Sequence, residues 1–483
     1  MSVSALGIGR RSLARPHLGA GAAVLLAALG AAIALAPPLY SALAIAAVGA
    51  VTLVTVKPEV GVYLLALTVP FQSLRGTDPT EVNITITEGV VALTLVAFFA
   101  RKLAIERGGW HSAPLLRPMI VLMAAMLLSF FKADDQLQSA KELAKWLEFT
   151  AVYWLAVGLL NSGRRVGALL AVLTVGALAE TAIGAAQVVL RLGPPQFLIG
   201  GLILRAYGTF GQPNPFAGYL NLTLPILVGI ALFAPGRWLR VWVALAAAAV
   251  AVVMVTTLSR GAWLGFAVAL LVMGIVASQR VAVWIWLSLL AGSMVILAAV
   301  FGVIPFGVSG RVLAAFGLSG VSLDSVTSEN FSAVQRLAFW QAGLNMFQNN
   351  PVLGVGIGNY ISSYPQYAAQ GWETVLGHAH DYYLNAAAET GLVGLAAYLL
   401  LVVAAFREVG RAVARAPRGL WYGVALGLLG SLTALSIHNL VDNMFVHGMP
   451  VLLGLLLGVA GAVARLGSAQ QPSTTIVPSL MAA

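Results

Sequence analysis

The segment GHAHDYYLN, residues 377–385, gathers the side chains best suited to acid–base chemistry in this chain. It holds His378 and His380, two of the six histidines in the sequence. Histidine suits a general base because its unperturbed pKa lies near neutrality. The segment allows three interpretations: His380 as a general base, an H-x-H metal pair, or histidines without a role. A metal pair would need further ligands, and none stand out in the sequence, so we expect no bound metal.

Two carboxylates near this segment are candidates for orienting the imidazole of His380. Asp381 is its direct neighbour, and Glu389 follows in the apolar start of a predicted helix. An unpaired carboxylate in such a helix is costly, which makes Glu389 a candidate for the site. A second polar group between two later apolar runs either completes the cavity wall or forms a polar turn: His438, Asn439, Asp442, Asn443 and His447.

Three arginines stand where a positive charge needs a partner. Arg260 lies in TTLSRGAWLG, a short turn between two apolar runs without a nearby acidic residue. It either extends to the lipid headgroups or binds an anion, and a planar guanidinium suits phosphate because it can bind two oxygens. Arg205 precedes the turn GTFGQPNP, in which Asn214 is a helix-capping residue or a ligand. Arg336 lies on a predicted amphipathic helix, where it is either solvated or part of the site.

Glycine-rich phosphate loops of the nucleotide-binding kind are not evident in the sequence. No G-x-x-x-x-G-K-[ST] motif occurs, so we expect no nucleotide. The glycines of LGVGIGNY, residues 353–360, either let backbone N–H groups approach a ligand or only make the loop flexible. The absence of cysteine excludes thiolate nucleophiles, disulfides and cysteine-ligated metals.

The elements that must position these residues are membrane helices. Of 483 residues, 60% are hydrophobic and 9% are charged, whereas soluble domains carry about 25% charged residues. We therefore expect an all-α polytopic membrane protein with about 12–14 transmembrane helices. The apolar runs lie near residues 20–36, 40–56, 59–71, 86–100, 115–131, 147–160, 165–190, 215–234, 238–257, 261–277, 281–303, 386–406, 419–437 and 448–464.

The basic residues indicate the orientation in the membrane. With the N-terminus in the cytoplasm, the cytoplasmic segments hold 18 of the 27 Lys and Arg residues and three of the 17 acidic ones, a balance of 18 − 3 = +15. Such an asymmetry is what the positive-inside rule expects, and it explains the pI near 10.0 without nucleic acid. The predicted parts are a cytoplasmic tail (1–17), transmembrane helices (18–303), an extracytoplasmic catalytic loop with an amphipathic helix (304–385), C-terminal transmembrane helices (386–465) and a disordered cytoplasmic tail (466–483).

The long loop contains a predicted helix of its own. Apolar residues recur at spacings of three and four and end at the breaker Asn350-Pro351. These residues are Val334, Leu337, Trp340, Leu344 and Phe347. A loop of about 80 residues with its own helix is a lid or a site-building element.

Together these features point to a transfer reaction on a lipid-linked sugar. Arginines can stabilise a departing pyrophosphate, and a histidine can take the proton of an acceptor hydroxyl. A polyprenyl-pyrophosphate sugar carries its own leaving group. Neither ATP nor a nucleotide sugar is then needed.

The order of four motifs resembles the O-antigen ligase / O-antigen polymerase superfamily. They are RAYGTFGQPNPFAGYL, SRGAWLG, RLAFWQAGLNMFQNNPVLGVGIGNY and HAHDYYLNAAAETGLVG, between about residues 205 and 400. The resemblance implies a GT-C-type membrane glycosyltransferase of the bacterial inner membrane that acts on the periplasmic side in lipopolysaccharide biosynthesis. It also implies an inverting, metal-independent transfer from an undecaprenyl-pyrophosphate-linked glycan, with no cofactor and no nucleic-acid partner.

The same resemblance implies roles for individual residues. It makes Arg260 and Arg336 the pyrophosphate ligands and His380 the base. Arg205 matches the arginine that precedes G-T-F-x-x-P-N in the family, whose role is less defined. Asp381 stands where the family more often has Asn. The full set of predicted site residues is His380, Arg260, Arg336, Arg205, Asn214, Asp381 and Glu389.

Several functions stay open from the sequence. A ligase transfers the glycan to a lipid A core, a polymerase to another lipid-linked repeat, and a related group to protein hydroxyls; we favour the ligase. A transporter of lipid-linked saccharides is the alternative of a different class. Its best support is Glu180 and Gln187, which lie inside a long apolar run.

Overall fold

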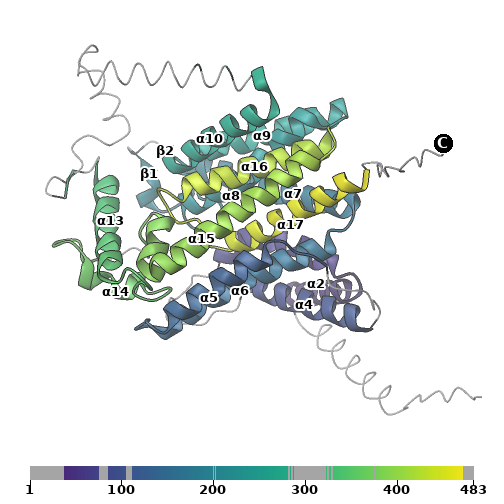
Figure 1. Cartoon of the computed structure of the whole chain (residues 1–483). Coiled ribbons are helices and arrows are strands. Elements are labelled where there is room, and N and C mark those ends of the chain that lie inside the picture. Colours follow the sequence, from purple (N-terminus) through teal and green to yellow (C-terminus); the bar gives the residue numbers. More distant parts are fainter. Residues whose placement is uncertain are drawn as a thin grey trace, which may run out of the picture. The chain divides into compact units, whose positions relative to one another are not determined.

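A computed structural model describes most of the chain (Figure 1). The described residues are 37–74, 85–104, 111–199, 201, 203–280, 330–374 and 377–470, with 283, 287, 322, 323, 326 and 327. The predicted N-terminal tail, the predicted span 20–36, most of the predicted span 281–303, most of the loop before residue 330 and the end of the C-terminal tail lie outside them.

The described residues form helices almost throughout. In chain order the elements are α2 (Pro38–Val56), α3 (Glu59–Thr68), η1 (Val69–Leu74), α4 (Ile86–Ala104), α5 (Leu116–Phe130), α6 (Gln136–Leu159), α7 (Gly163–Leu190), η2 (Pro195–Phe197), β1 (Leu198–Ile199), β2 (Ile203–Leu204), α8 (Pro213–Phe233), α9 (Arg237–Thr256), α10 (Arg260–Ala277), α13 (Phe331–Asn349), α14 (Tyr360–Tyr367), α15 (Tyr382–Arg415), α16 (Leu420–His438) and α17 (Met449–Gln470). The strands β1 and β2 pair antiparallel, with Leu198 opposite Leu204.

The predicted fold class is confirmed: the chain is an all-α polytopic membrane protein. Eight described helices are long and apolar enough to cross a membrane, namely α2, α7, α8, α9, α10, α15, α16 and α17. A helix also stands at every other predicted apolar run that falls within the described residues, although α3 and α5 are short. Helix α2 belongs to one compact unit, Met1–Lys57, and all other described elements belong to a second, Pro58–Ala483.

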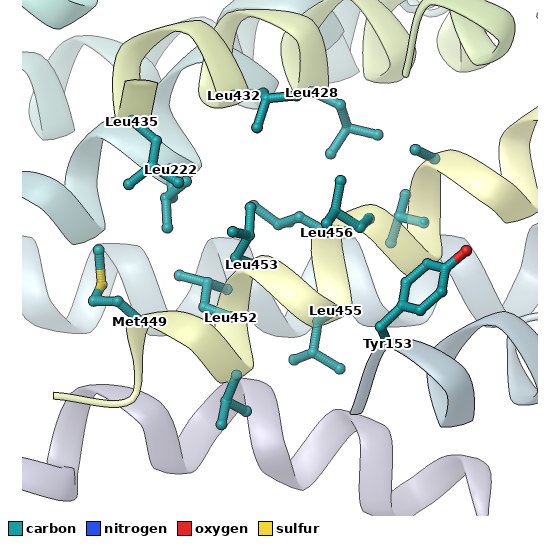
Figure 2. Close-up of a cluster of buried hydrophobic side chains, with 14 of the residues drawn as sticks. Tyr153, Leu222, Leu428, Leu432, Leu435, Met449, Leu452, Leu453, Leu455 and Leu456 are labelled. Atoms are coloured by element: carbon teal, nitrogen blue, oxygen red, sulfur yellow. The ribbon is translucent and has the colours of Figure 1, made fainter. Parts of the chain in front are cut away.

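The core of the second unit is built around α17, whose side chains are almost all buried. Leucines of α16 and α17 interlock with Leu222 of α8 and Tyr153 of α6 (Figure 2). Helices α8 and α16 approach closely, because glycines face glycines: a Cβ on Gly229 would overlap the backbone of Gly423. This close packing holds the α16–α17 connection, residues 439–448, in place at one end of the helices.

Helix α15 is broken near its start, and a loop fills the break. Gly391 adopts φ 64° and ψ −163°, so the helix cannot continue through it. The N–H of Leu392 donates to Pro351 O (2.8 Å), and Ala388 O accepts from Val355 N (3.0 Å). Backbone groups in an apolar environment must be paired, so the glycine-rich loop replaces the missing helical hydrogen bonds.

Helix α13 lies where the spacing predicts an amphipathic helix, but it buries a different face. Of the five predicted apolar positions only Val334 is buried, while Leu344 is 47% exposed. The buried stripe consists of Val334, Ala338, Phe339, Ala342, Gly343 and Met346. The stripe mixes large residues with the small Ala338, Ala342 and Gly343. At Gly343 the packing on α15 is close, because a Cβ there would press on Leu384.

Replacing Gly391 by alanine should destabilise the protein. The backbone region that Gly391 occupies is almost exclusive to glycine, and a Cβ there would overlap the carbonyl of Val352. We expect a loss of about 2 kcal/mol or more, or failure to fold, seen as earlier thermal unfolding in detergent. Gly410→Ala in the same helix is the matched control. Its Cβ meets open space, so it should be neutral or stabilise by up to about 1 kcal/mol; equal effects of both variants would contradict the account.

Candidate active site

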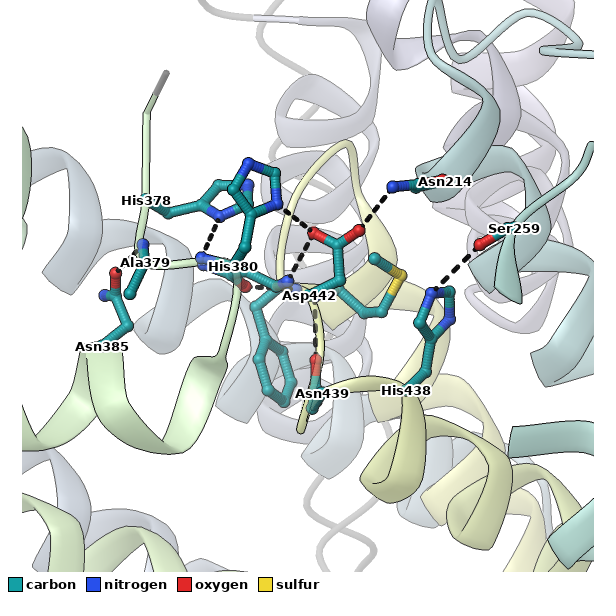
Figure 3. A network of polar contacts seen from close by, with 12 residues as sticks. Asn214, Ser259, His378, Ala379, His380, Asn385, His438, Asn439 and Asp442 are labelled. Carbon is teal, nitrogen blue, oxygen red and sulfur yellow. Dashed lines mark hydrogen bonds and ion pairs between the residues drawn. The ribbon is translucent and has the colours of Figure 1, made fainter. Parts of the chain in front are cut away.

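His380 is held at three of its polar groups. Its backbone N–H donates to His378 Nδ1 (3.1 Å), and its ring Nδ1 lies 3.1 Å from Asp442 Oδ1 (Figure 3). Its carbonyl accepts from Trp340 Nε1 (3.4 Å). The ring of Phe339 stacks on the imidazole of His380, with ring centroids 5.7 Å apart and an angle of 10° between the ring planes. His380 adopts a left-handed backbone with φ 51°, which costs a non-glycine residue about 1–3 kcal/mol. The surrounding contacts therefore fix both the backbone and the ring.

Asp442, in the α16–α17 connection, is the carboxylate that contacts the histidine. Its Oδ1 accepts from His380 Nδ1 and from Asn443 N (2.9 Å), and its Oδ2 accepts from Asn214 Nδ2 (2.7 Å). Burial favours a raised pKa for Asp442, but the hydrogen bond from His380, and the positive charge of its ring when it is protonated, outweigh burial and hold this pKa well below its usual range. An ionised Asp442 requires the ring proton of His380 on Nδ1, which leaves Nε2 with its lone pair as a base.

The two carboxylates that the sequence offered as partners of His380 have other roles. Asp381 caps α15, since its Oδ1 accepts from Leu384 N (3.0 Å). Glu389 points into the glycine loop and accepts from Tyr360 N (3.1 Å). The expectation that either one orients the imidazole is corrected here, because helix capping and loop anchoring use their oxygens.

Asp442 was visible in the sequence as a member of the second polar group, but it could not be assigned as the partner of His380. It is the only acidic residue after Glu408, and an isolated carboxylate between apolar runs signals a buried role. Its pairing with His380, 62 residues away, depends on the tertiary fold. The two histidines of the same polar group contact different serines. His447 Nδ1 lies 2.7 Å from Ser73 Oγ. His438 Nε2 lies 3.5 Å from Ser259 Oγ, beside the turn that carries Arg260.

Arg205 is joined to Asp442 through an asparagine. Its Nη2 donates to Asn214 Oδ1 (3.0 Å), and the amide of Asn214 donates in turn to Asp442. Its Nε donates to Thr257 O (2.7 Å) at the end of α9. A continuous path of hydrogen bonds thus runs from Arg205 through Asn214 and Asp442 to His380.

The three predicted arginines gather around this path. Burial and then the positive charges of Arg336 and Arg260 lower the pKa of Arg205, although Asp442 acts in the opposite direction. Arg260 reaches α13, where its Nη2 donates to Ser332 Oγ (3.4 Å). Three like charges within electrostatic range repel one another, so the cluster suits an anion with more than one negative charge.

The loop that carries Arg205 is held by two polar residues of α7. Glu180 accepts from Thr209 N (3.0 Å) and Thr209 Oγ1 (2.7 Å). Gln187 accepts from Gly208 N (2.9 Å) and donates to Gly208 O (2.8 Å). These contacts account for both polar side chains within an apolar helix, because they position the loop.

His378, His380 and Asp442 bring possible metal-ligand atoms within 4.8 Å of one another. The hydrogen bonding of His378 opposes such a site. A backbone N–H can only donate, so Nδ1 of His378 is the acceptor from His380 N, and the ring proton of a neutral His378 lies on Nε2. Burial and then the charge of His380 lower the pKa of His378 to about 4, so the ring is neutral near pH 7. With both ring nitrogens occupied, two ligands are left, fewer than zinc sites use.

Titration with Zn²⁺ should therefore detect no tight site at this cluster. Binding to all three side chains would have to break the bond between His380 N and His378 Nδ1. Calorimetry on the purified protein at pH 7 should give the same weak signal for the wild type and for His378→Ala. A tight site in the wild type that His378→Ala removes would overturn this interpretation.

The fold and site define a class: a polytopic membrane protein with a carboxylate-paired histidine beside an arginine cluster. A family model described as O-antigen ligase matches residues 245–399, a segment with Arg260, Arg336 and His380. Over these residues the match confirms the predicted resemblance to the O-antigen ligase / O-antigen polymerase superfamily. Arg205, Asn214 and Asp442 lie outside the matched segment. The search of curated proteins returns no match.

Proposed function

We propose that this protein is an O-antigen ligase-like glycosyltransferase that moves a glycan from undecaprenyl-pyrophosphate to an acceptor hydroxyl, with a lipid A core as the favoured acceptor. The observation that carries the proposal is the path of hydrogen bonds from Arg205 through Asn214 and Asp442 to His380. It joins a group able to bind a departing anion to a group able to accept a proton. The superfamily match supports a reaction of this type.

In this mechanism His380 acts as the general base. Its Nε2 takes the proton of the acceptor hydroxyl while the hydroxyl oxygen attacks the anomeric carbon of the donor glycan. The bond between that carbon and the pyrophosphate oxygen breaks, and its electron pair leaves with the pyrophosphate. Asp442, fixed on Nδ1, stabilises the imidazolium that forms. Attack from the face opposite the leaving group inverts the anomeric centre.

The arginines stabilise the pyrophosphate that leaves. Negative charge grows on the leaving oxygen as the bond breaks, and fixed positive groups lower the barrier most when they are already in place. Arg205 is preset by Thr257 and Asn214, and Arg260 by the loop helix α13. These fixed charges supply the role that a divalent cation has in other phosphate-releasing enzymes, so no metal or nucleotide enters the reaction.

The site is placed on the periplasmic face of the bacterial inner membrane in this proposal. Support comes from the helix ends away from the site, which carry a strongly basic set of residues, as cytoplasmic ends do. Described members of this set are Arg101, Lys102, Arg117, Arg164, Arg165, Arg237, Arg240, Arg280, Arg407, Arg411, Arg415, Arg418 and Arg465. The lipid-linked donor and the membrane lipids then reach the site from the outer leaflet.

Variants of the proposed machinery should lose glycan transfer but stay folded. His380→Ala removes the base and should lower the rate by about 10²–10⁴-fold, the usual contribution of general base catalysis. Arg260→Ala should lower it by at least about 10²-fold. Asp442→Asn leaves the shape but removes the charge behind the imidazole, and should also lower kcat. Rates are measured with purified protein and lipid-linked glycan, with detergent gel filtration to confirm folding.

The control is Lys132→Ala, an exposed basic residue beyond α5 that should retain full activity. Wild-type rates of glycan transfer in both His380→Ala and Arg260→Ala would refute the proposal that the protein is a glycosyltransferase with this site. If lipid-linked glycan crosses vesicle membranes without being transferred to an acceptor, this result supports the transporter function instead.

The acceptor is identified by offering each candidate acceptor separately. Purified protein is given one lipid-linked glycan donor and, in separate reactions with EDTA throughout, a lipid A core, a second lipid-linked repeat or a protein. We expect product with the lipid A core. Product only with the lipid-linked repeat would identify a polymerase, and product only with protein would identify the third group. Dependence on added divalent metal would contradict the mechanism.

A further inference from the structure

The segment before α15 has no regular secondary structure, and side chains hold its backbone instead. The N–H of Ala379 donates to Asn385 Oδ1 (3.1 Å), and the N–H of His380 donates to His378 Nδ1 (3.1 Å) (Figure 3). The imidazoles of His378 and His380 lie with their centroids 4.3 Å apart. His378 therefore serves as an acceptor for the backbone of the proposed base.

The hydrogen bond from His380 N acts at the strained residue itself. His380 has φ 51°, a left-handed conformation that non-glycine residues adopt only when their surroundings enforce it. The carbonyl and ring of His380 are fixed by Trp340 and Asp442. His378 fixes the remaining backbone group, the N–H, from only two residues away.

We propose that His378 is a positioning residue: its Nδ1 holds the backbone N–H of His380, so that the imidazole keeps Nδ1 on Asp442 and presents Nε2 to the acceptor hydroxyl. This inference rests on the proposed function, because it gives His378 a role only if His380 is the base. It differs from a bystander role, which the sequence allows, and from metal ligation, which the hydrogen bond opposes.

Two substitutions separate positioning from simple packing. His378→Asn keeps an acceptor, since Oδ1 of Asn lies the same number of bonds from Cα as Nδ1 of His. His378→Leu keeps similar bulk but has no acceptor. Misplacing a catalytic group by about 1 Å can cost about 10²-fold in rate. We therefore expect kcat to fall about 10–100-fold in His378→Leu and to recover to within about fivefold of wild type in His378→Asn.

The measurement is kcat and KM for the purified full-length chain, normalised to the folded fraction from detergent gel filtration. A positioning defect lowers kcat and leaves the KM for the lipid-linked donor nearly unchanged, because the arginines are intact. Equal kcat values for the Asn and Leu variants would overturn the proposal, whether both are high or both low. If His378→Leu does not fold, His378→Ala takes its place in the comparison.

His380→Ala is measured in the same series to separate the two levels of inference. If His380→Ala keeps wild-type activity, the proposed function itself fails. If His380→Ala is inactive while His378→Leu matches the wild type, only the positioning role of His378 fails. His447→Asn is the matched histidine control: it contacts Ser73 rather than the His380 backbone, and it should leave kcat unchanged.

Discussion

Every backbone polar group in an apolar surrounding must find a partner, and this constraint decides the structure around the candidate site. Much of the site lies on non-helical backbone: the turn after β2, the turn before α10, the segment before α15 and the α16–α17 connection. Asn214, Arg260 and Arg336 lie on helices, the first two at the starts of α8 and α10. Water is scarce among packed membrane helices, so side chains take over the pairing. Gln187 satisfies Gly208, Asn385 satisfies Ala379, and Asn439 Oδ1 accepts from Met444 N. Polar side chains within and beside the apolar runs thus support the backbone of the site.

The same constraint explains the break in α15. A helix that ran unbroken from Tyr382 would satisfy its own backbone and offer no place for the glycine loop. With Gly391 out of helical geometry, the loop of residues 351–360 pairs with both sides of the break, and Glu389 anchors Tyr360. Helix α13 leads directly into this loop. The break therefore ties the helix that carries Arg336 to the helix that begins beside His380.

The helices were largely predictable from the sequence, whereas the contacts inside the site were not. Long apolar runs have one stable form in lipid, so their lengths reveal the spans. The charge of Arg260 in a short turn and the histidine before α15 were visible as anomalies, and the fold brings Arg205, Arg260 and Arg336 within electrostatic range. The partner of His380 was not visible, because Asp381 is adjacent in sequence but Asp442 is adjacent in space. The buried face of α13 was also predicted wrongly, since it includes the small residues Ala338, Ala342 and Gly343, which a pattern of large apolar residues does not mark.

The path from Arg205 to His380 also links the two halves of the proposed chemistry electrostatically. Asp442 lies between His380, the base of the proposed mechanism, and, through Asn214, Arg205, its proposed pyrophosphate ligand. A carboxylate placed directly on Arg205 would neutralise it and weaken its hold on pyrophosphate. Asn214 avoids this, because a neutral amide can accept from the guanidinium on one side and donate to the carboxylate on the other. The negative charge is thereby directed toward the imidazole, where a positive charge develops, and the arginines keep theirs for the anion.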